Sequence, residues 1–182
     1  MQQCIRIIGG SYRGKKITFP SHATLRPTPN RIRETLFNWL MHDIRGARCL
    51  DAFAGSGALG LEAFSRGAHT VIFLEQDINT YLHLKKNIDD FHSNRLTIIH
   101  TDALQYLNMQ SPPFDIIFLD PPFNSQLQQQ CIALLSASNI LRKHGLLYIE
   151  SPIPMILDST QWELLHAKQA GQVAYALYRN VY

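Results

Sequence analysis

From Ala47 to Glu150, strand-like and helix-like stretches alternate along the chain, and this order constrains the fold more than any other feature of the sequence. Short apolar runs predict strands at residues 48–53, 70–75, 96–100, 114–120 and 145–150. The stretches between them predict helices at residues 59–66, 78–91, 103–109 and 126–141. Such alternation is typical of an α/β protein with a parallel sheet covered on both faces. Residues 162–168 and 172–179 flank Gly171 and predict an antiparallel hairpin that completes the sheet.

An extension precedes this alternating part. Two β-like runs, Cys4–Ile8 and Lys16–Phe19, flank a basic loop and predict a hairpin. After Pro27 and Pro29, a helix is expected to begin with Asn30 as its cap and to run to residue 41 or 42. The chain of 182 residues therefore suits one main domain, residues 44–182, with a small N-terminal extension, residues 1–43.

Positive charge is concentrated in that extension. Residues 1–33 contain seven Lys and Arg residues and no Asp or Glu, which leaves a net charge of −4 on the other 149 residues because the whole chain carries +3. A basic arm on a mildly acidic body favours docking of a polyanion such as a nucleic acid over an ordinary solvated basic surface. Tyr12, in the hairpin loop, is either a ring that stacks on a base or a packing residue.

Several classes of protein are disfavoured. No apolar run approaches the roughly 20 residues of a membrane span, and the N-terminus lacks the apolar region of a signal peptide. The three cysteines are far apart and the eight histidines show no ligand spacing, so neither disulfides nor a metal site are expected. A reducing cytoplasm fits this pattern.

A glycine-rich loop follows the first predicted strand of the main domain. Gly55, Gly57 and Gly60 permit a tight turn whose backbone amides can approach a ligand at a helix N-terminus. The spacing also fits the dinucleotide fingerprint, and Glu75 stands 20 residues after Gly55, where NAD enzymes place the acid that binds ribose. A nicotinamide-dependent oxidoreductase is therefore a competing interpretation.

Three features favour S-adenosylmethionine over a dinucleotide. Asp51 precedes the glycines, where a carboxylate can reach the amino acid end of a sulfonium-bearing ligand but would repel a pyrophosphate. Asp102 follows the third strand, where it can accept a hydrogen bond from the adenine amino group. An oxidoreductase would also need a substrate domain, and little chain remains to form one.

The stretch FDIIFLDPPF, residues 114–123, predicts a buried strand that ends at Asp120 because the two prolines cannot continue it. In open α/β sheets, ligands bind at the carboxyl ends of the strands. The Asp120 carboxylate and the Pro121 carbonyl can accept both hydrogens of an exocyclic amino group on a base, and Phe123 can stack on its ring. The base must be unstacked to reach this site. Methylation at cytosine C5 is disfavoured, because that reaction needs a nucleophilic cysteine and the chain contains no Pro-Cys dipeptide.

At this point the sequence resembles a known family. The stretches IRIIGGSYRGKKITFP, LRPTPNRIRETLFNWL, LDAFAGSGALGLEAFSRGA, FDIIFLDPPF and AGQVAYALYR together resemble the RsmD family of bacterial 16S ribosomal RNA guanine-N2 methyltransferases. The resemblance implies a class I S-adenosylmethionine-dependent methyltransferase (Rossmann-like) fold, with seven strands in the order 3-2-1-4-5-7-6 and an antiparallel last strand. It also implies methylation of one guanine in the head of the small ribosomal subunit, on assembled or partly assembled particles. No feature demands an oligomer or an obligate protein partner, so we expect a monomer.

The resemblance carries site residues onto matching positions. It implies a catalytic group comprising Asp120, Pro121, Pro122 and Phe123. The cofactor would be bound by Asp51, Ala54, Gly55, Ser56, Gly57, Glu75, Gln76, Asp102, Ala103 and Asp120. RNA would be bound by Arg6, Tyr12, Arg13, Lys15, Lys16, Arg26, Arg31 and Arg33. The block Arg26-Pro27-Thr28 is expected to close over the cofactor.

The chain departs from the family pattern at Asn30, where Asp is common, at Ala52, where a larger apolar residue is usual, and in the loop 151–159. Two other functions stay open. Asp-Pro-Pro followed by an aromatic residue also serves adenine-N6 methylation of DNA or RNA. A non-catalytic RNA-binding or ribosome-assembly factor would be expected to lose Asp120 or the glycine loop, and this chain retains both.

Overall fold

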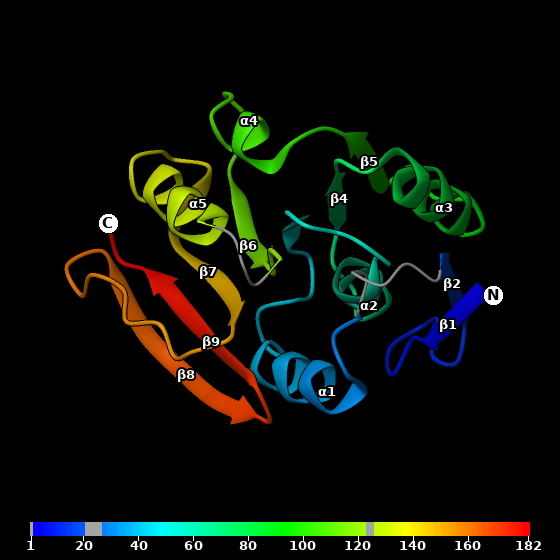
Figure 1. Ribbon diagram of the computed structural model, residues 1–182, viewed down its shortest axis with the longest axis horizontal. Coiled ribbons are helices and arrows are strands. Elements are labelled where there is room, and N and C mark those ends of the chain that lie inside the picture. The colour runs from blue at the N-terminus through cyan, green and yellow to red at the C-terminus, as the bar shows by residue number, and fades with distance from the viewer. Residues whose placement is uncertain (1, 21–26, 123–125) are drawn as a thin grey trace.

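A computed structural model describes residues 2–20, 27–122 and 126–182. A seven-stranded sheet in the order β5-β4-β3-β6-β7-β9-β8 forms its centre (Figure 1). The strands are β3 (Arg48–Asp51), β4 (Thr70–Glu75), β5 (Leu96–His100), β6 (Phe114–Leu119), β7 (Leu141–Ser151), β8 (Trp162–Ala170) and β9 (Val173–Asn180). The first five are parallel, and β9 is antiparallel to both neighbours, β7 and β8. Numbered within this sheet, the order is 3-2-1-4-5-7-6, which confirms the predicted fold class.

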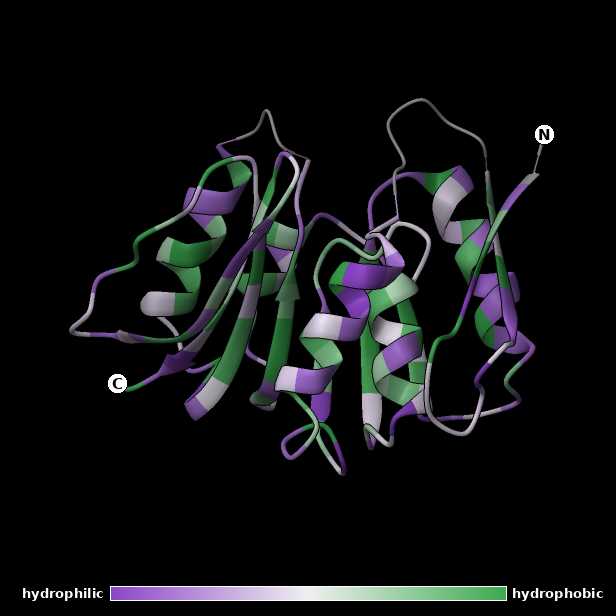
Figure 2. Cartoon of the chain, turned by 90° about the horizontal axis from the view of Figure 1, so that it is seen from below, coloured by the Kyte–Doolittle hydropathy of each residue, from purple (hydrophilic) through white to green (hydrophobic). Residues whose placement is uncertain are grey.

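The helices divide between the two faces of the sheet. They are α1 (Asn30–Trp39), α2 (Ala58–Ser65), α3 (Ile78–Asp89), α4 (Ala103–Leu107) and α5 (Leu127–Ser136). Successive side chains of a strand point to opposite faces. Ile116 and Phe118 of β6 therefore lie in the core with α1, α2 and α3, whereas Ile117 and Leu119 lie in the core with α4 and α5. The central strands are accordingly the most hydrophobic part of the chain (Figure 2).

The predicted N-terminal hairpin is present. Strand β1 (Gln2–Arg6) pairs antiparallel with β2 (Lys16–Pro20) in a separate two-stranded sheet, which lies beside α3 at the opposite side of the molecule from β8 (Figure 1). Buried Glu62 of α2 joins this hairpin to the main domain. Its two carboxylate oxygens accept hydrogen bonds from the backbone amides of Ile8 and Gly9, each at 2.8 Å.

Two local predictions are wrong. Asn30 is not the cap of α1, since Pro29 occupies that position without a capping side chain, and the Asn30 side-chain oxygen instead accepts a hydrogen bond from Arg33 Nη2 at 2.6 Å. The helix expected at 126–141 ends at Ser136. Residues from Leu141 onwards belong to β7 because Leu141 pairs with Phe114 of β6. The other predicted elements are present with ends shifted by a few residues. No helix within the described ranges is long and apolar enough to cross a bilayer.

Candidate active site

Five acidic residues lie at the carboxyl edge of the parallel strands. Asp51 ends β3, Glu75 ends β4, Asp102 follows β5, Asp120 follows β6, and Glu150 is the penultimate residue of β7. The five strands are consecutive in the sheet, so the topology brings these carboxyl groups to one edge. The sequence predicted four of them as site residues, namely Asp51, Glu75, Asp102 and Asp120. In the part of the chain that the structure describes, no group of His, Cys, Asp and Glu side chains has a metal-binding arrangement.

The glycine loop connects β3 to α2 and is shaped by two left-handed residues. Gly55 has a φ of 50° and Gly57 a φ of 79°, conformations that L side chains rarely adopt. A Cβ atom on Gly57 would also lie 2.5 Å from Leu84 Cδ1 of α3, so another residue there would have to displace that side chain as well as adopt a strained backbone conformation. The backbone at this turn is therefore held close to α3, and Ala54, Ser56 and Gly57 are buried.

Two of the predicted cofactor carboxylates hold this loop in place. Asp51 Oδ2 accepts a hydrogen bond from the Gly60 amide at 2.9 Å, and Glu75 Oε2 accepts one from the Gly55 amide at 3.0 Å. Burial raises the pKa of Asp51 to about 7, against the opposing effect of the Gly60 amide, and burial also raises the pKa of Glu75. Asp51, only 2% exposed, is thus primarily an anchor of the loop.

The remaining predicted cofactor residues surround the same edge. The second oxygen of Glu75, Oε1, accepts a hydrogen bond from the Asp77 amide at 2.8 Å, and Asp102 caps α4 by accepting from the Gln105 amide at 3.0 Å. A carboxylate can accept about four hydrogen bonds, so Glu75 and Asp102 both retain acceptor capacity for a ligand. Gln76 is exposed and Ala103 is buried.

Asp120 lies at the end of the central strand β6. Its side chain is half-buried, Pro121 is buried and Pro122 is exposed. Burial first, and then the nearby carboxyls of Glu150 and Asp51, raise the pKa of Asp120 well above the ordinary value for an aspartate, and contact with the Thr28 hydroxyl opposes them. Phe123, the predicted stacking residue, lies outside the described residues.

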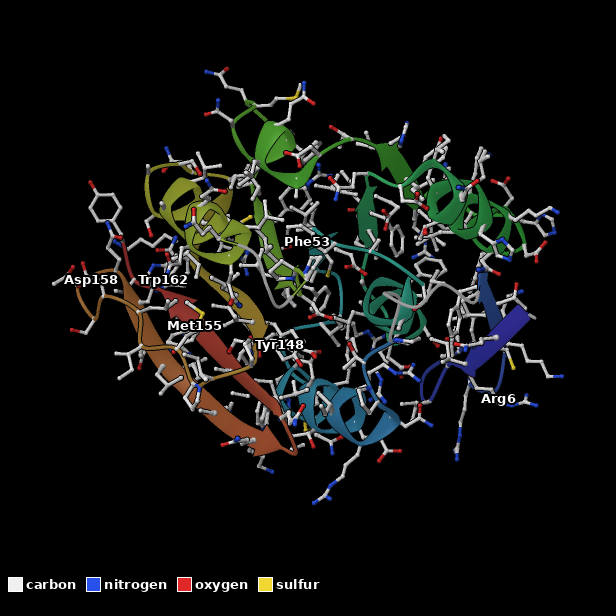
Figure 3. The ribbon with its side chains drawn as sticks, in the orientation of Figure 1. Arg6, Phe53, Tyr148, Met155, Asp158 and Trp162 are labelled. Carbon is white, nitrogen blue, oxygen red and sulfur yellow. The ribbon has the colours of Figure 1, made fainter. Side chains whose placement is uncertain are left out.

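Glu150 and Tyr148 were not predicted as site residues, whereas Thr28 belongs to the block 26–28 that was expected to close over the cofactor. Glu150 is 3% exposed, and its Oε1 accepts hydrogen bonds from Thr28 Oγ1 and from the Tyr148 hydroxyl, both at 2.9 Å. Figure 3 shows Tyr148 of β7 and Phe53, which follows β3, in the central part of the molecule. Arg6 lies at the outer edge of the molecule in the same view. A signal was available, because the LLYIE run ends in a carboxylate as the β4 run does at Glu75.

The basic residues of the extension differ in accessibility. Arg6, Arg13, Lys16 and Arg31 are exposed, although Arg6 Nη1 donates a hydrogen bond to the Gly14 carbonyl at 2.9 Å. Lys15 is half-buried, with its Nζ 4.6 Å from the centre of the Phe91 ring and donating to the Asp90 carbonyl. Arg26 lies outside the described residues.

Two predicted RNA contacts need correction. Arg33 is fully buried. Its Nη1 donates a hydrogen bond to the Arg6 carbonyl at 3.1 Å and lies 3.6 Å from a Glu62 carboxylate oxygen. Arg33 therefore cannot contact RNA in this structure. Tyr12 packs on Phe64 and Phe91, with ring centroids 5.5 and 4.8 Å away. These contacts favour the packing interpretation of Tyr12 over the stacking one.

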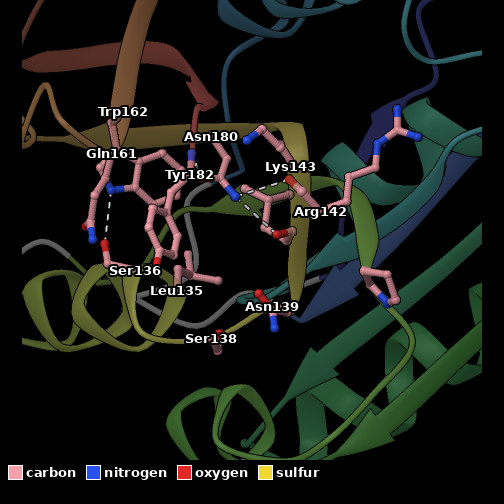
Figure 4. A pocket seen from close by; sticks show the side chains of 12 residues that line it. Leu135, Ser136, Ser138, Asn139, Arg142, Lys143, Gln161, Trp162, Asn180 and Tyr182 are labelled. Carbon is pink, nitrogen blue, oxygen red and sulfur yellow. Dashed lines mark hydrogen bonds between the residues drawn. The ribbon is translucent and has the colours of Figure 1, made fainter.

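A pocket of about 290 Å³ lies elsewhere, at the amino end of β7 and near the start of β8 (Figure 4). Trp162 Nε1 donates a hydrogen bond across it to Ser136 Oγ, and Asn180 donates to the carbonyls of Leu141 and Arg142. Among the described residues that line this pocket there is no Asp or Glu, and the pocket lies at the opposite ends of β6 and β7 from Asp120 and Glu150. It is therefore separate from the candidate active site.

A seven-stranded sheet of this order, with a glycine loop after its first strand and an Asp-Pro-Pro turn after its fourth, defines the class of Rossmann-like methyltransferases. Residues 5–179 match the family model described as Conserved hypothetical protein 95. The chain is 44% identical over 178 residues to ribosomal RNA small subunit methyltransferase D of Escherichia coli, covering 97% of this chain and 90% of that protein. It therefore belongs to the family of ribosomal RNA small subunit methyltransferase D, as the resemblance to the RsmD family predicted.

Two solved structures share the fold. A protein from Escherichia coli described only as a candidate methyltransferase, yhhF, superposes with a TM-score of 0.91 at 42% identity, covering 98% of this chain and 99% of that one. A T. thermophilus 16S rRNA N2 G1207 methyltransferase, solved with AdoMet and guanosine, superposes with a TM-score of 0.72 at 23% identity. That likeness covers 100% of this chain and 50% of the other, and at such identity it shows the fold alone.

Proposed function

We propose that this chain transfers a methyl group from S-adenosylmethionine to the exocyclic N2 of one guanine in the 16S RNA of the small ribosomal subunit. The observation that carries the proposal is the position of Asp120 and Pro121, at the carboxyl end of β6 beside the strand that leads into the glycine loop. Membership of the family of ribosomal RNA small subunit methyltransferase D supports the RNA substrate.

The residues at the sheet edge fit the proposed cofactor. Glu75 has free acceptor capacity for ribose hydroxyls, and Asp102 has it for the adenine amino group. The tight turn at Gly55 and Gly57 lets the backbone approach a ligand at the start of α2. When bound, S-adenosylmethionine would supply an electrophilic methyl group on a cationic sulfur. The buried acids Asp51 and Glu150 and the half-buried Asp120 suit a cation better than a pyrophosphate.

Asp120 and Pro121 would prepare the guanine amino group. The nitrogen lone pair of this group is delocalised into the base, which makes it a weak nucleophile. The Asp120 carboxylate and the Pro121 carbonyl would accept its two hydrogens and orient the lone pair towards the methyl group, and proline holds that carbonyl in a fixed direction. After transfer, Asp120 would accept the proton that the nitrogen must release.

The extension would bind RNA. Arg6, Arg13, Lys16 and Arg31 present positive charge to solvent on residues that precede the catalytic part of the chain. We accordingly propose that residues 1–43 form the RNA-binding extension and residues 44–182 the methyltransferase domain. Finer parts of the proposal are that the substrate is an assembled or partly assembled small subunit, and that the protein acts as a monomer in the cytoplasm.

The decisive experiment identifies the methylated nucleoside. Purified protein is incubated with labelled S-adenosylmethionine and with small-subunit particles from cells that lack the protein, and the RNA is then digested to nucleosides. Label in N2-methylguanosine is expected. Label in N6-methyladenosine would instead establish the adenine alternative, which the Asp-Pro-Pro turn also accommodates.

Naked 16S RNA and particles are compared in parallel. Transfer to particles at a higher rate than to naked RNA is expected if the substrate is an assembled subunit. Binding of S-adenosylmethionine without transfer to any ribosomal substrate would support the non-catalytic assembly factor and refute the proposed function.

A further inference from the structure

Glu150 is held rigidly beside Asp120. The sheet pairs Leu119 of β6 with Ile149 of β7, so Asp120 and Glu150 follow at the same level of two neighbouring strands. The Glu150 carboxyl receives hydrogen bonds from Tyr148 and Thr28, and its backbone carbonyl accepts another from Gln128 Nε2 of α5 at 2.7 Å. Contacts from β7, from the segment before α1 and from α5 therefore restrict this residue.

Thr28 connects the two carboxyl groups. It is 6% exposed and lies just before α1, and its hydroxyl donates to Glu150 Oε1 while also contacting the Asp120 carboxyl. A hydroxyl has one hydrogen to donate, so it cannot serve two carboxylates at once. The hydroxyl can turn from Glu150 to the Asp120 carboxylate, and this contact favours the ionised form of Asp120 because it opposes the rise in the pKa of that group.

The surroundings of the pair disfavour two negative charges. The Asp51 carboxyl at the end of β3 raises the pKa of Asp120 electrostatically, and the Glu75 carboxyl at the end of β4 raises the pKa of Asp51 in the same way. On the other side, Tyr148 contacts Glu150 and has Tyr175 of β9 as its neighbour. Burial raises the pKa of Glu150 against the effect of its two hydrogen bonds, and it raises the pKa of Tyr148, which stays a neutral donor. Like charges this close in a buried site cannot both ionise easily.

We propose that Glu150 is a positioning residue for methyl transfer, which acts on Asp120 through the Thr28 hydroxyl and through its own buried negative charge. This inference rests on the methyltransferase function proposed above. In the reaction, a bond forms between the guanine N2 and the methyl carbon, the bond from that carbon to sulfur breaks, and its electron pair stays on sulfur. The nitrogen then loses a proton to the Asp120 carboxylate. Glu150 makes Asp120 a stronger proton acceptor, and Thr28 keeps Asp120 from being neutralised too early.

Substitutions of Glu150 and of Thr28 should shift the pKa of Asp120 in opposite directions. Glu150→Gln removes the negative charge but keeps an oxygen that can accept from Tyr148 and Thr28, so Asp120 should lose its proton at a pH lower by about one unit. Thr28→Val removes the hydroxyl, so Asp120 should lose its proton at a higher pH, and Thr28→Ser should restore the wild-type value. Glu163→Gln makes the same chemical change on exposed β8 and serves as the control, with no expected shift.

Two measurements test this. In the first, the side-chain carboxyl of Asp120 is titrated by carbon NMR in protein labelled at aspartate, with its signal assigned from Asp120→Asn. In the second, the acid limb of the pH–rate profile for methyl transfer is compared among the same variants at saturating substrate. The midpoint of the NMR titration and the midpoint of the acid limb should both move to lower pH for Glu150→Gln and to higher pH for Thr28→Val.

A merely structural role for Glu150 would lower the rate at every pH and leave both midpoints unchanged, which would overturn the proposal. The NMR titration needs no substrate, so it tests the Asp120–Glu150 coupling even if methyl transfer to guanine were not observed. Absence of transfer by the wild-type protein, with the titration shifts present, would refute the proposed function alone.

Discussion

Glu62 offers the sharpest test of how the basic extension is attached to the catalytic domain. Its fully buried carboxylate accepts hydrogen bonds from the amides of Ile8 and Gly9, forms an ion pair with Arg66 at 2.7 Å, and lies 3.6 Å from fully buried Arg33. We expect Glu62→Ala to lower the free energy of unfolding by about 3–5 kcal/mol, because it leaves a buried guanidinium without its counter-charge. Stability totals of about 5–15 kcal/mol are typical of such domains, so this loss should be obvious.

The matched control is Glu163→Ala. Glu163 also pairs with an arginine, Arg179, at 3.1 Å, but both side chains are about half exposed, at 51% and 42%. Surface ion pairs contribute less than about 1 kcal/mol, so this variant should unfold nearly as the wild type does. Urea denaturation followed by circular dichroism measures both variants.

A second variant tests the physical reason. If the cost of Glu62→Ala comes from an unpaired buried cation, adding Arg33→Met should recover part of the lost stability, since methionine fills similar space without charge. A double variant as unstable as Glu62→Ala, or a Glu62→Ala loss no larger than that of Glu163→Ala, would refute the reasoning. Binding of small-subunit particles should fall in Glu62→Ala, because the hairpin would no longer be held in a fixed position.

Three further predictions follow from the site. Asp120→Asn should abolish methyl transfer while changing the affinity for S-adenosylmethionine less than about tenfold, measured by calorimetry; a larger loss of affinity would make Asp120 chiefly a cofactor ligand. Replacing exposed Arg13 and Lys16 by glutamate should weaken particle binding and flatten its dependence on salt, with cofactor affinity unchanged; an unaltered salt slope would remove the hairpin from the RNA interface. Asp51 has a folded-state pKa of about 7, above its ordinary value, so its ionisation should destabilise the fold as the pH rises from about 4 to about 7. Asp51→Asn should therefore gain stability relative to wild type as the pH rises from about 4 to about 7 in denaturation experiments, and a difference that stays constant over this range would contradict the assignment.

Much of the site could be predicted because local sequence specifies where strands end. Asp51, Glu75, Asp102 and Asp120 each follow an apolar run, and the carboxyl ends of parallel strands share one edge. The glycines at 55 and 57 were likewise readable, since both adopt the left-handed conformations that favour glycine. Strand order is not a local property, and here it was inferred from the resemblance to a family and then confirmed by the sheet.

The chain by itself thus determined the α/β class, the methyltransferase family and the acids at the strand ends, because these depend on periodicity and on contiguous motifs. Only the tertiary structure decided which charged side chains are exposed and which are buried in ion pairs. Arg33 belongs to a basic stretch, yet it is buried beside Glu62, which is distant in sequence and whose carboxylate neutralises it. The Thr28–Glu150 hydrogen bond joins residues 122 positions apart. No sequence pattern specifies such a contact, since it forms only when β7 and the segment before α1 pack at the same edge of the sheet.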